Sequence, residues 1–179
     1  MEHEKSQALT SETERALELI GRAIRMAGYR NVKSVQEITG KKNIKNPIEI
    51  QKGAGYQGSD SLLTWHELSE GIDFDCIGNV LTNDRTKHNL ALQGFLVERQ
   101  AGLPKGARAN GGSLMCQSLD RQGRIQSTTL MNGISNLKID ELNPSINQGQ
   151  RAFRIKLEMT DGASLQKAFT RTFTTRNLP

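Results

Sequence analysis

The sequence predicts a single α+β domain, in which an N-terminal amphipathic helix packs on an antiparallel sheet. Apolar residues recur at helical spacing near the start of the chain, and from about residue 61 the apolar period changes to two, as in strands with one buried face. The length of 179 residues matches one domain, and no repeat or linker divides the chain. We therefore expect the helix within residues 1–30, a connecting loop over 31–60 and a β-rich region over 61–179.

The helix is predicted over residues 11–28. Ser11 followed by Glu14 forms a capping box, and Gly28 is typical of a helix end. The apolar stripe is expected to face the sheet, and a charged flank lies off that stripe, free to meet other subunits. The core face comprises Leu17, Ile20, Ala23 and Ile24, and the candidate subunit interface comprises Arg15, Glu18, Arg22 and Arg25.

The strands are predicted from the period of two that follows the polar 31–60 stretch. The clearest is 153–159, where apolar and charged residues alternate strictly. The segment 101–113 holds five of the glycine and proline residues and is expected to be a loop. The strands are expected at 62–68, 72–77, 90–98, 114–119, 125–131, 137–142, 153–159 and 165–175.

Composition indicates a folded chain with a modest basic excess. Lys and Arg number 24 against 19 Asp and Glu, a net charge of +5. No run approaches the 18 apolar residues of a membrane span, and the start has no apolar core of the kind that a signal peptide needs. With eight aromatic residues there is little stacking surface for bases. DNA is therefore expected to bind weakly at most, through Lys41, Lys42 and Lys45.

Two cysteines, Cys76 and Cys116, admit three interpretations. A zinc site is disfavoured, because no His or Cys lies at ligand spacing beside either of them. A catalytic thiol is disfavoured at Cys76, because the acidic residues before it would raise its pKa. The remaining interpretation is a disulfide or two buried thiols. Ile72, Phe74 and Cys76 alternate with acidic residues, which places all three on the apolar face of a strand; we favour the disulfide.

Other motifs have structural explanations. The glycine-rich loop 102–113 is not followed by a helix, so it is not expected to bind phosphate. His66 is expected to be structural, because its neighbours on a strand point to the opposite face. No two titratable residues are placed to act together, so no enzymatic activity, cofactor, metal or small-molecule substrate is expected.

Charge is distributed unevenly along the chain. Residues 22–52 carry eight basic and two acidic residues, whereas residues 60–75 carry five acidic residues and no basic one. The acidic set is expected to form a solvated edge. Such a bipolar surface suits head-to-tail docking of related subunits.

Several segments of the chain together resemble one known family. The most specific is RMAGYR at 25–30, within a helical segment that spans 11–30. The further segments are SDSLL at 59–63, DCIGN at 75–79, LMNGISNLKI at 130–139, AFRIKL at 152–157 and FTTRN at 173–177. With these segments the chain resembles PilW-type minor pilins of type IV pili nearly end to end, and 11–30 is similar to the end of that family's long N-terminal helix.

The resemblance implies a type IV pilin-like fold and a subunit that helps to start pilus assembly, with the pilus fibre or its tip as the candidate positions. Its partners would be other minor pilins and the major pilin. It also implies a leader and a hydrophobic helix anchored in the inner membrane, with a periplasmic globular domain; this chain lacks that helix. Many members carry a cysteine just after the segment 28–30, where this chain has Asn31. The alternatives are a J-type pseudopilin of type II secretion and a DNA-binding pilin for DNA uptake.

Overall fold

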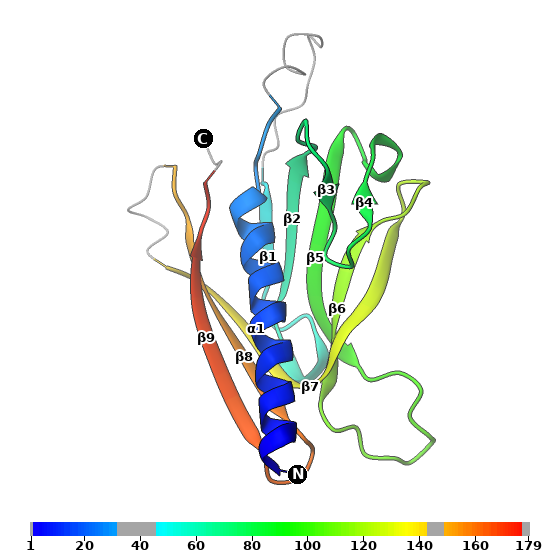
Figure 1. Ribbon diagram of the computed structural model, residues 1–179, viewed down its shortest axis with the longest axis vertical. Helices are drawn as coiled ribbons and strands as arrows, with labels where there is room; N and C mark the ends of the chain where they lie inside the picture. Colours follow the sequence, from blue (N-terminus) through cyan, green and yellow to red (C-terminus); the bar gives the residue numbers. More distant parts are fainter. Residues whose placement is uncertain (1, 32–45, 143–148, 177–179) are drawn as a thin grey trace.

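The structure is a computed structural model that describes residues 2–31, 46–142 and 149–176. One helix and nine strands occupy these residues, with two short 3-10 turns, η1 and η2 (Figure 1). The elements are α1 Glu2–Met26, β1 Ile48–Gln51, η1 Tyr56–Gly58, β2 Ser61–Glu67, β3 Asp73–Phe74, β4 Val80–Leu81, η2 Asn83–Arg85, β5 Leu90–Arg99, β6 Gly112–Leu119, β7 Ile125–Leu142, β8 Ala152–Thr160 and β9 Gln166–Thr174.

The expected α+β, pilin-like fold class is wrong. The molecule is mostly one seven-stranded antiparallel sheet of order β1-β2-β5-β6-β7-β8-β9, with β3 and β4 forming a small second sheet. In the described part of the chain α1 is the single α-helix. The helical period was the strongest local signal, but strands β5 to β8 each pair with the next strand along the chain, and these pairings dominate the architecture.

Several element boundaries differ from those predicted. α1 already runs from Glu2, and Ser11 lies inside it, where Thr10 and Thr13 bond backward to the carbonyls of Ser6 and Leu9. The helix ends before Gly28, which has the positive φ of 77° expected of a terminator. β1 forms within the stretch expected to be a loop. β3 has two residues, and the predicted strands 125–131 and 137–142 are one strand, β7.

The core joins the apolar stripe of α1 to the side chains of the sheet that face it. Leu17 is 2% exposed, and Ile20, Ala23 and Ile24 are fully buried. At Gly21 the helix passes so near β9 that an added Cβ would lie 2.2 Å from the ring of Phe173. This close approach explains why a glycine occupies the middle of a helix, where it is otherwise unfavourable.

β7 is long because its two halves pair with different strands. Its first half pairs with β6 and its second half with β8, and register shifts mark the change. Beyond Ile134, which pairs with the first residue of β6, Ser59 and Asp60 bond to the edge of β7. The Leu137 amide donates to the Ser59 hydroxyl at 3.1 Å, the Asp60 amide donates to the Leu137 carbonyl at 2.8 Å, and the Ile139 amide donates to the Asp60 carboxylate at 2.8 Å. Ser59 and Asp60 thus satisfy backbone groups of β7 that β6 does not reach.

Candidate interaction surface

The predicted flank of α1 lies on the side of the helix away from the core. Arg15, Glu18 and Arg22 are exposed, and Arg25 is half-buried. Arg25 forms an ion pair with Glu18 at 2.7 Å, and its guanidinium lies 5.7 Å from the ring centroid of Phe173 on β9. The flank therefore has two parts: Arg25 is held by the protein's own residues, whereas Arg15 and Arg22 are exposed, and Arg15 lies beside a groove.

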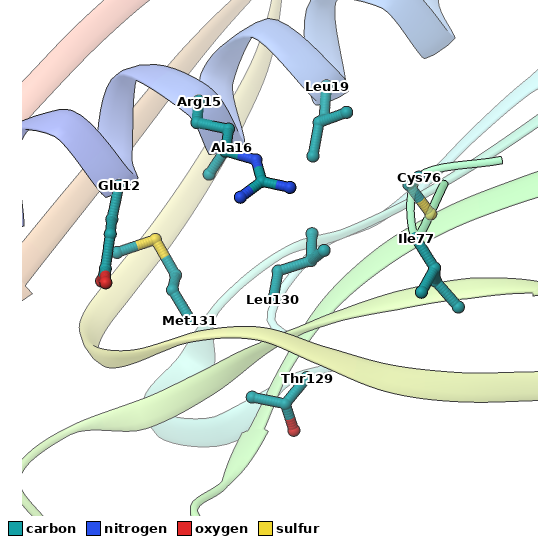
Figure 2. A pocket seen from close by; sticks show the side chains of 9 residues that line it. All are labelled: Glu12, Arg15, Ala16, Leu19, Cys76, Ile77, Thr129, Leu130 and Met131. Atoms are coloured by element: carbon teal, nitrogen blue, oxygen red, sulfur yellow. The ribbon is translucent and has the colours of Figure 1, made fainter. Parts of the chain in front are cut away.

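A groove runs beside α1, between the helix, β7 and the turn that holds Cys76. Figure 2 shows Arg15 and Leu19 pointing from the helix toward Leu130, with Cys76 and Ile77 on the opposite wall. The groove has a volume of about 290 Å³. A second hollow of about 480 Å³ continues it along the first half of the helix. The residues lining both hollows are Glu12, Thr129, Leu130 and Met131.

The β3–β4 hairpin presents apolar side chains to solvent beside this groove. Ile72 is 70% exposed, and Phe74 and Val80, which lie opposite each other across the hairpin, are 39% and 47% exposed. The prediction that Ile72 and Phe74 face the core with Cys76 is wrong, since only Cys76 is buried. Exposed apolar residues grouped in this way are typical of a protein-binding surface.

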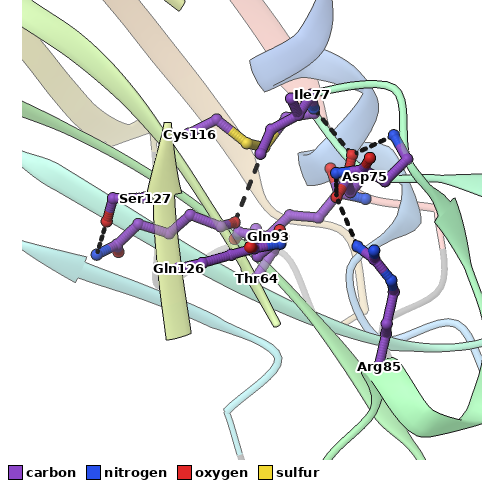
Figure 3. The surroundings of a disulfide bond; sticks show 12 residues. Thr64, Asp75, Ile77, Arg85, Gln93, Cys116, Gln126 and Ser127 are labelled. Carbon is purple, nitrogen blue, oxygen red and sulfur yellow. Dashed lines mark hydrogen bonds and ion pairs between the residues drawn. A yellow bond between two sulfur atoms is a disulfide. The ribbon is translucent and has the colours of Figure 1, made fainter. Parts of the chain in front are cut away.

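A turn at Asp75 breaks the predicted strand 72–77. The buried Asp75 carboxylate accepts hydrogen bonds from the amides of Ile77 and Asn79, at 3.0 and 2.8 Å, and Arg85 lies 3.9 Å away (Figure 3). Cys76 forms the expected disulfide with Cys116 of β6, with the two Cα atoms 6.0 Å apart. Asp75 thus shapes the turn, and the disulfide ties the hairpin to the sheet.

The acidic residues predicted to form a solvated edge are largely used inside the molecule. Glu67 is 4% exposed, pairs with Arg30 at 3.0 Å and accepts the Asn31 amide. Asp60 and Asp75 are each 3% exposed. The prediction of a solvated edge is therefore wrong for Asp60, Glu67 and Asp75, because these carboxylates are satisfied within their own chain, whereas Glu70 is exposed. Lys41, Lys42 and Lys45, the candidates for DNA contact, lie outside the described residues.

In comparisons with family models, curated proteins and solved structures, nothing matches this chain. Within the described ranges, no three His, Cys, Asp or Glu side chains are grouped as metal ligands would be. Over the same ranges, no helix is both long and apolar enough to span a bilayer.

The sequence analysis missed the groove and the exposed hairpin. The groove is built from α1, β7 and the Cys76 turn, which are far apart in sequence, so no local pattern indicates it. The hairpin did carry a signal: Asp75, Gly78 and Asn79 are turn-forming residues, and Asp at the start of such a turn bonds the amides two and four residues on.

His66 lies on β2 with its side chain buried, 1% exposed, and its Nδ1 has no hydrogen-bond partner. Burial lowers the pKa of His66; Asp73 opposes this shift and Arg22 adds to it. Below pH about 6.5 the unfolded chain therefore binds a proton that the folded chain does not. We expect the free energy of unfolding to fall as the pH drops from 7.5 to 5.5. Urea denaturation at each pH measures this fall as a decrease in the midpoint concentration.

The His66→Gln variant should flatten this pH dependence, because the titrating group is gone. The matched control is His88→Gln, since His88 is exposed. A pH dependence that survives in His66→Gln and disappears in His88→Gln would contradict the assignment to His66.

Proposed function

We propose that this chain is an assembly subunit that acts by binding other protein subunits, as the minor pilins that it resembles in sequence do. The observation that carries the proposal is the groove beside α1, together with the exposed hairpin at its side. One face of the helix is buried in the core, and the opposite face offers charged residues to a neighbour. The expected partners are other minor pilins and the major pilin.

The two parts of the surface have different roles in this proposal. The apolar residues Leu19, Leu130 and Ile77 in the groove, with Phe74 and Val80 on the hairpin, bury area against the partner. Arg15 and Arg22 at the helix set the orientation and the choice of partner, because complementary charges contribute more to specificity than to affinity. A catalytic role is not part of the proposal.

The test reverses the charge of Arg15 and Arg22 together, as Arg15→Glu and Arg22→Glu. Arg25 is left unchanged, because its contacts with Glu18 and Phe173 belong to the fold. In cells that assemble pili, we expect the variant to recover at least tenfold less of the other minor pilins on co-purification and to form fewer fibres.

The matched control carries the same change of charge on the opposite side of the sheet. Arg154 on β8 and Lys138 on β7 lie on the face that points away from α1, and both are exposed. The control is therefore Arg154→Glu with Lys138→Glu. Equal partner recovery from the two double variants, with unchanged melting temperatures, would overturn the proposal.

A further inference from the structure

β9 forms one edge of the seven-stranded sheet, and in the described chain no strand pairs with its outer side. It has nine residues, contains no proline and pairs with β8 without a register shift. The opposite edge strand, β1, has only four residues. A long, regular edge strand is a template for pairing with another strand, and proteins usually interrupt or cover such edges.

The backbone groups that β9 offers can be assigned from its pairing with β8. Just beyond the two ends of the ladder, the Thr175 amide donates to the Arg151 carbonyl at 2.9 Å and the Asp161 amide to the Leu165 carbonyl at 3.2 Å. Hydrogen-bonded pairs alternate along an antiparallel ladder, so the odd-numbered residues of β9 direct their backbone to β8. The even-numbered residues direct theirs outward: Gln166, Ala168, Thr170, Thr172 and Thr174.

One further observation agrees with this assignment. The Thr170 carbonyl accepts a hydrogen bond from the guanidinium of its neighbour Arg171 at 3.1 Å, as an outward carbonyl without a strand partner can. This exposed side-chain bond can be exchanged for a backbone bond at little cost, because water competes for it.

We propose that two copies of this chain pair through β9, antiparallel and about a two-fold axis at Thr170. In this register Lys167 lies opposite Phe173 of the second copy, and Phe169 lies opposite Arg171. A cation over an aromatic ring is favourable, and Phe173 already receives the Arg25 guanidinium within its own chain. On the other face Thr170 meets Thr170, and Ala168 meets Thr172.

The charged residues of β9 favour this register over the two registers that are centred one residue away. An axis at Phe169 would place Lys167 opposite Arg171, and an axis at Arg171 would place that residue opposite itself. Like charges directly opposite each other destabilise an antiparallel pair. The register centred on Thr170 avoids both contacts and uses all nine residues of the strand.

The contacts of α1 with β9 lie on one face of the strand. Figure 1 shows the helix alongside β9, and the residues of β9 that contact it include Lys167, Arg171 and Phe173, which are all odd-numbered and share that face. Arg171 pairs with Glu14 of α1 at 2.6 Å, and Lys167 bonds to Ser6, so the strand is held to the helix in an extended form. The pairing goes beyond the proposed function, because it joins identical chains at a surface outside the groove.

The test introduces one thiol at the centre of the pairing. Both native cysteines are in the Cys76–Cys116 disulfide, so Thr170→Cys adds a single free thiol. Opposite residues of a hydrogen-bonded pair have Cα atoms about 5.5 Å apart, within disulfide range. In the control, Thr172→Cys, the two introduced thiols are offset by four residues, about 13 Å along the strand. Under mild oxidation we expect at least tenfold more cross-linked dimer from Thr170→Cys.

A second variant, Thr170→Pro, tests the pairing without a cross-link. The Thr170 amide points outward, so proline removes no bond to β8 and the chain should fold with a melting temperature near that of wild type. Sedimentation equilibrium should show a concentration-dependent dimer for the wild-type chain and a monomer for Thr170→Pro. A monomeric wild type, a Thr170→Pro variant that still dimerises, or equal cross-linking of the two cysteine variants would overturn the proposal.

Discussion

Replacing Cys76 and Cys116 together by alanine is expected to lower the free energy of unfolding by about 4 kcal/mol. The disulfide spans 40 residues of sequence, from the hairpin turn to the middle of β6. Without it the unfolded chain gains the conformational freedom of a loop of that length. For a chain of this size the melting temperature should fall by roughly 10 °C, measured by calorimetry.

Reduction of the wild-type chain provides the control for this prediction. A reductant should lower the melting temperature of wild type to near that of the double variant and leave the variant unchanged. If the free energy of unfolding of the double variant lies within about 1 kcal/mol of that of oxidised wild type, the disulfide does not make the expected contribution to stability.

Asp60→Ala is expected to destabilise the protein by about 3 kcal/mol, the second large effect. The Asp60 carboxylate accepts the amides of Gly53 and Ile139, at 2.9 and 2.8 Å, and pairs with Lys52 at 2.6 Å. Removing it leaves the buried amide of Ile139 without a partner. Asp60→Asn should not restore stability, because an amide side chain has one acceptor oxygen in place of two. Urea denaturation measures both variants.

Lys52→Met separates the ion pair from the backbone contacts. The Lys52 side chain is 55% exposed, so its loss should cost less than about 1 kcal/mol. Burial tends to raise the pKa of Asp60, but the hydrogen bonds from Lys52, Ile139 and Gly53 outweigh it and lower the pKa. The stabilisation from Asp60 should therefore be present at neutral pH and disappear as the pH falls through and below 3.8. A loss in Lys52→Met as large as that in Asp60→Ala would contradict the role given to the backbone amides.

The helix could be predicted from sequence because its signals are local. The spacing of Leu17, Ile20, Ala23 and Ile24 appears within three turns, and Gly28 marks its end. The strand 153–159 was also recognisable, since apolar and charged residues alternate over its whole length, and the predicted strands 90–98 and 114–119 lie within β5 and β6. The predicted fold class was wrong because it depends on how many strands pair into one sheet, and the periodicity of a single strand does not reveal its pairing.

The part of the candidate site that lies on α1 was predictable, because its signal is also local. Helical spacing places Arg15, Glu18 and Arg22 together on an exposed face, but it does not show that Arg25 reaches Phe173 on the last strand. The acidic residues between positions 60 and 75 were expected at the surface because three of the five lie on or beside predicted strands, at positions expected to face outward. Glu67 and Asp75 are exceptions, since Arg30 and the backbone amides of a turn satisfy them.

The contact between α1 and β9 determines when the molecule can finish folding. Glu14 pairs with Arg171, which lies 157 positions further along the chain, and Gly21 touches Phe173, so these contacts of α1 form only after β9 has been made. Contacts of such long sequence separation slow folding, because a large loop must close before they form. While the ribosome is still making β8 and β9, the side of α1 that packs on these two strands remains uncovered. That side of the helix is therefore accessible to chaperones until β9 has emerged.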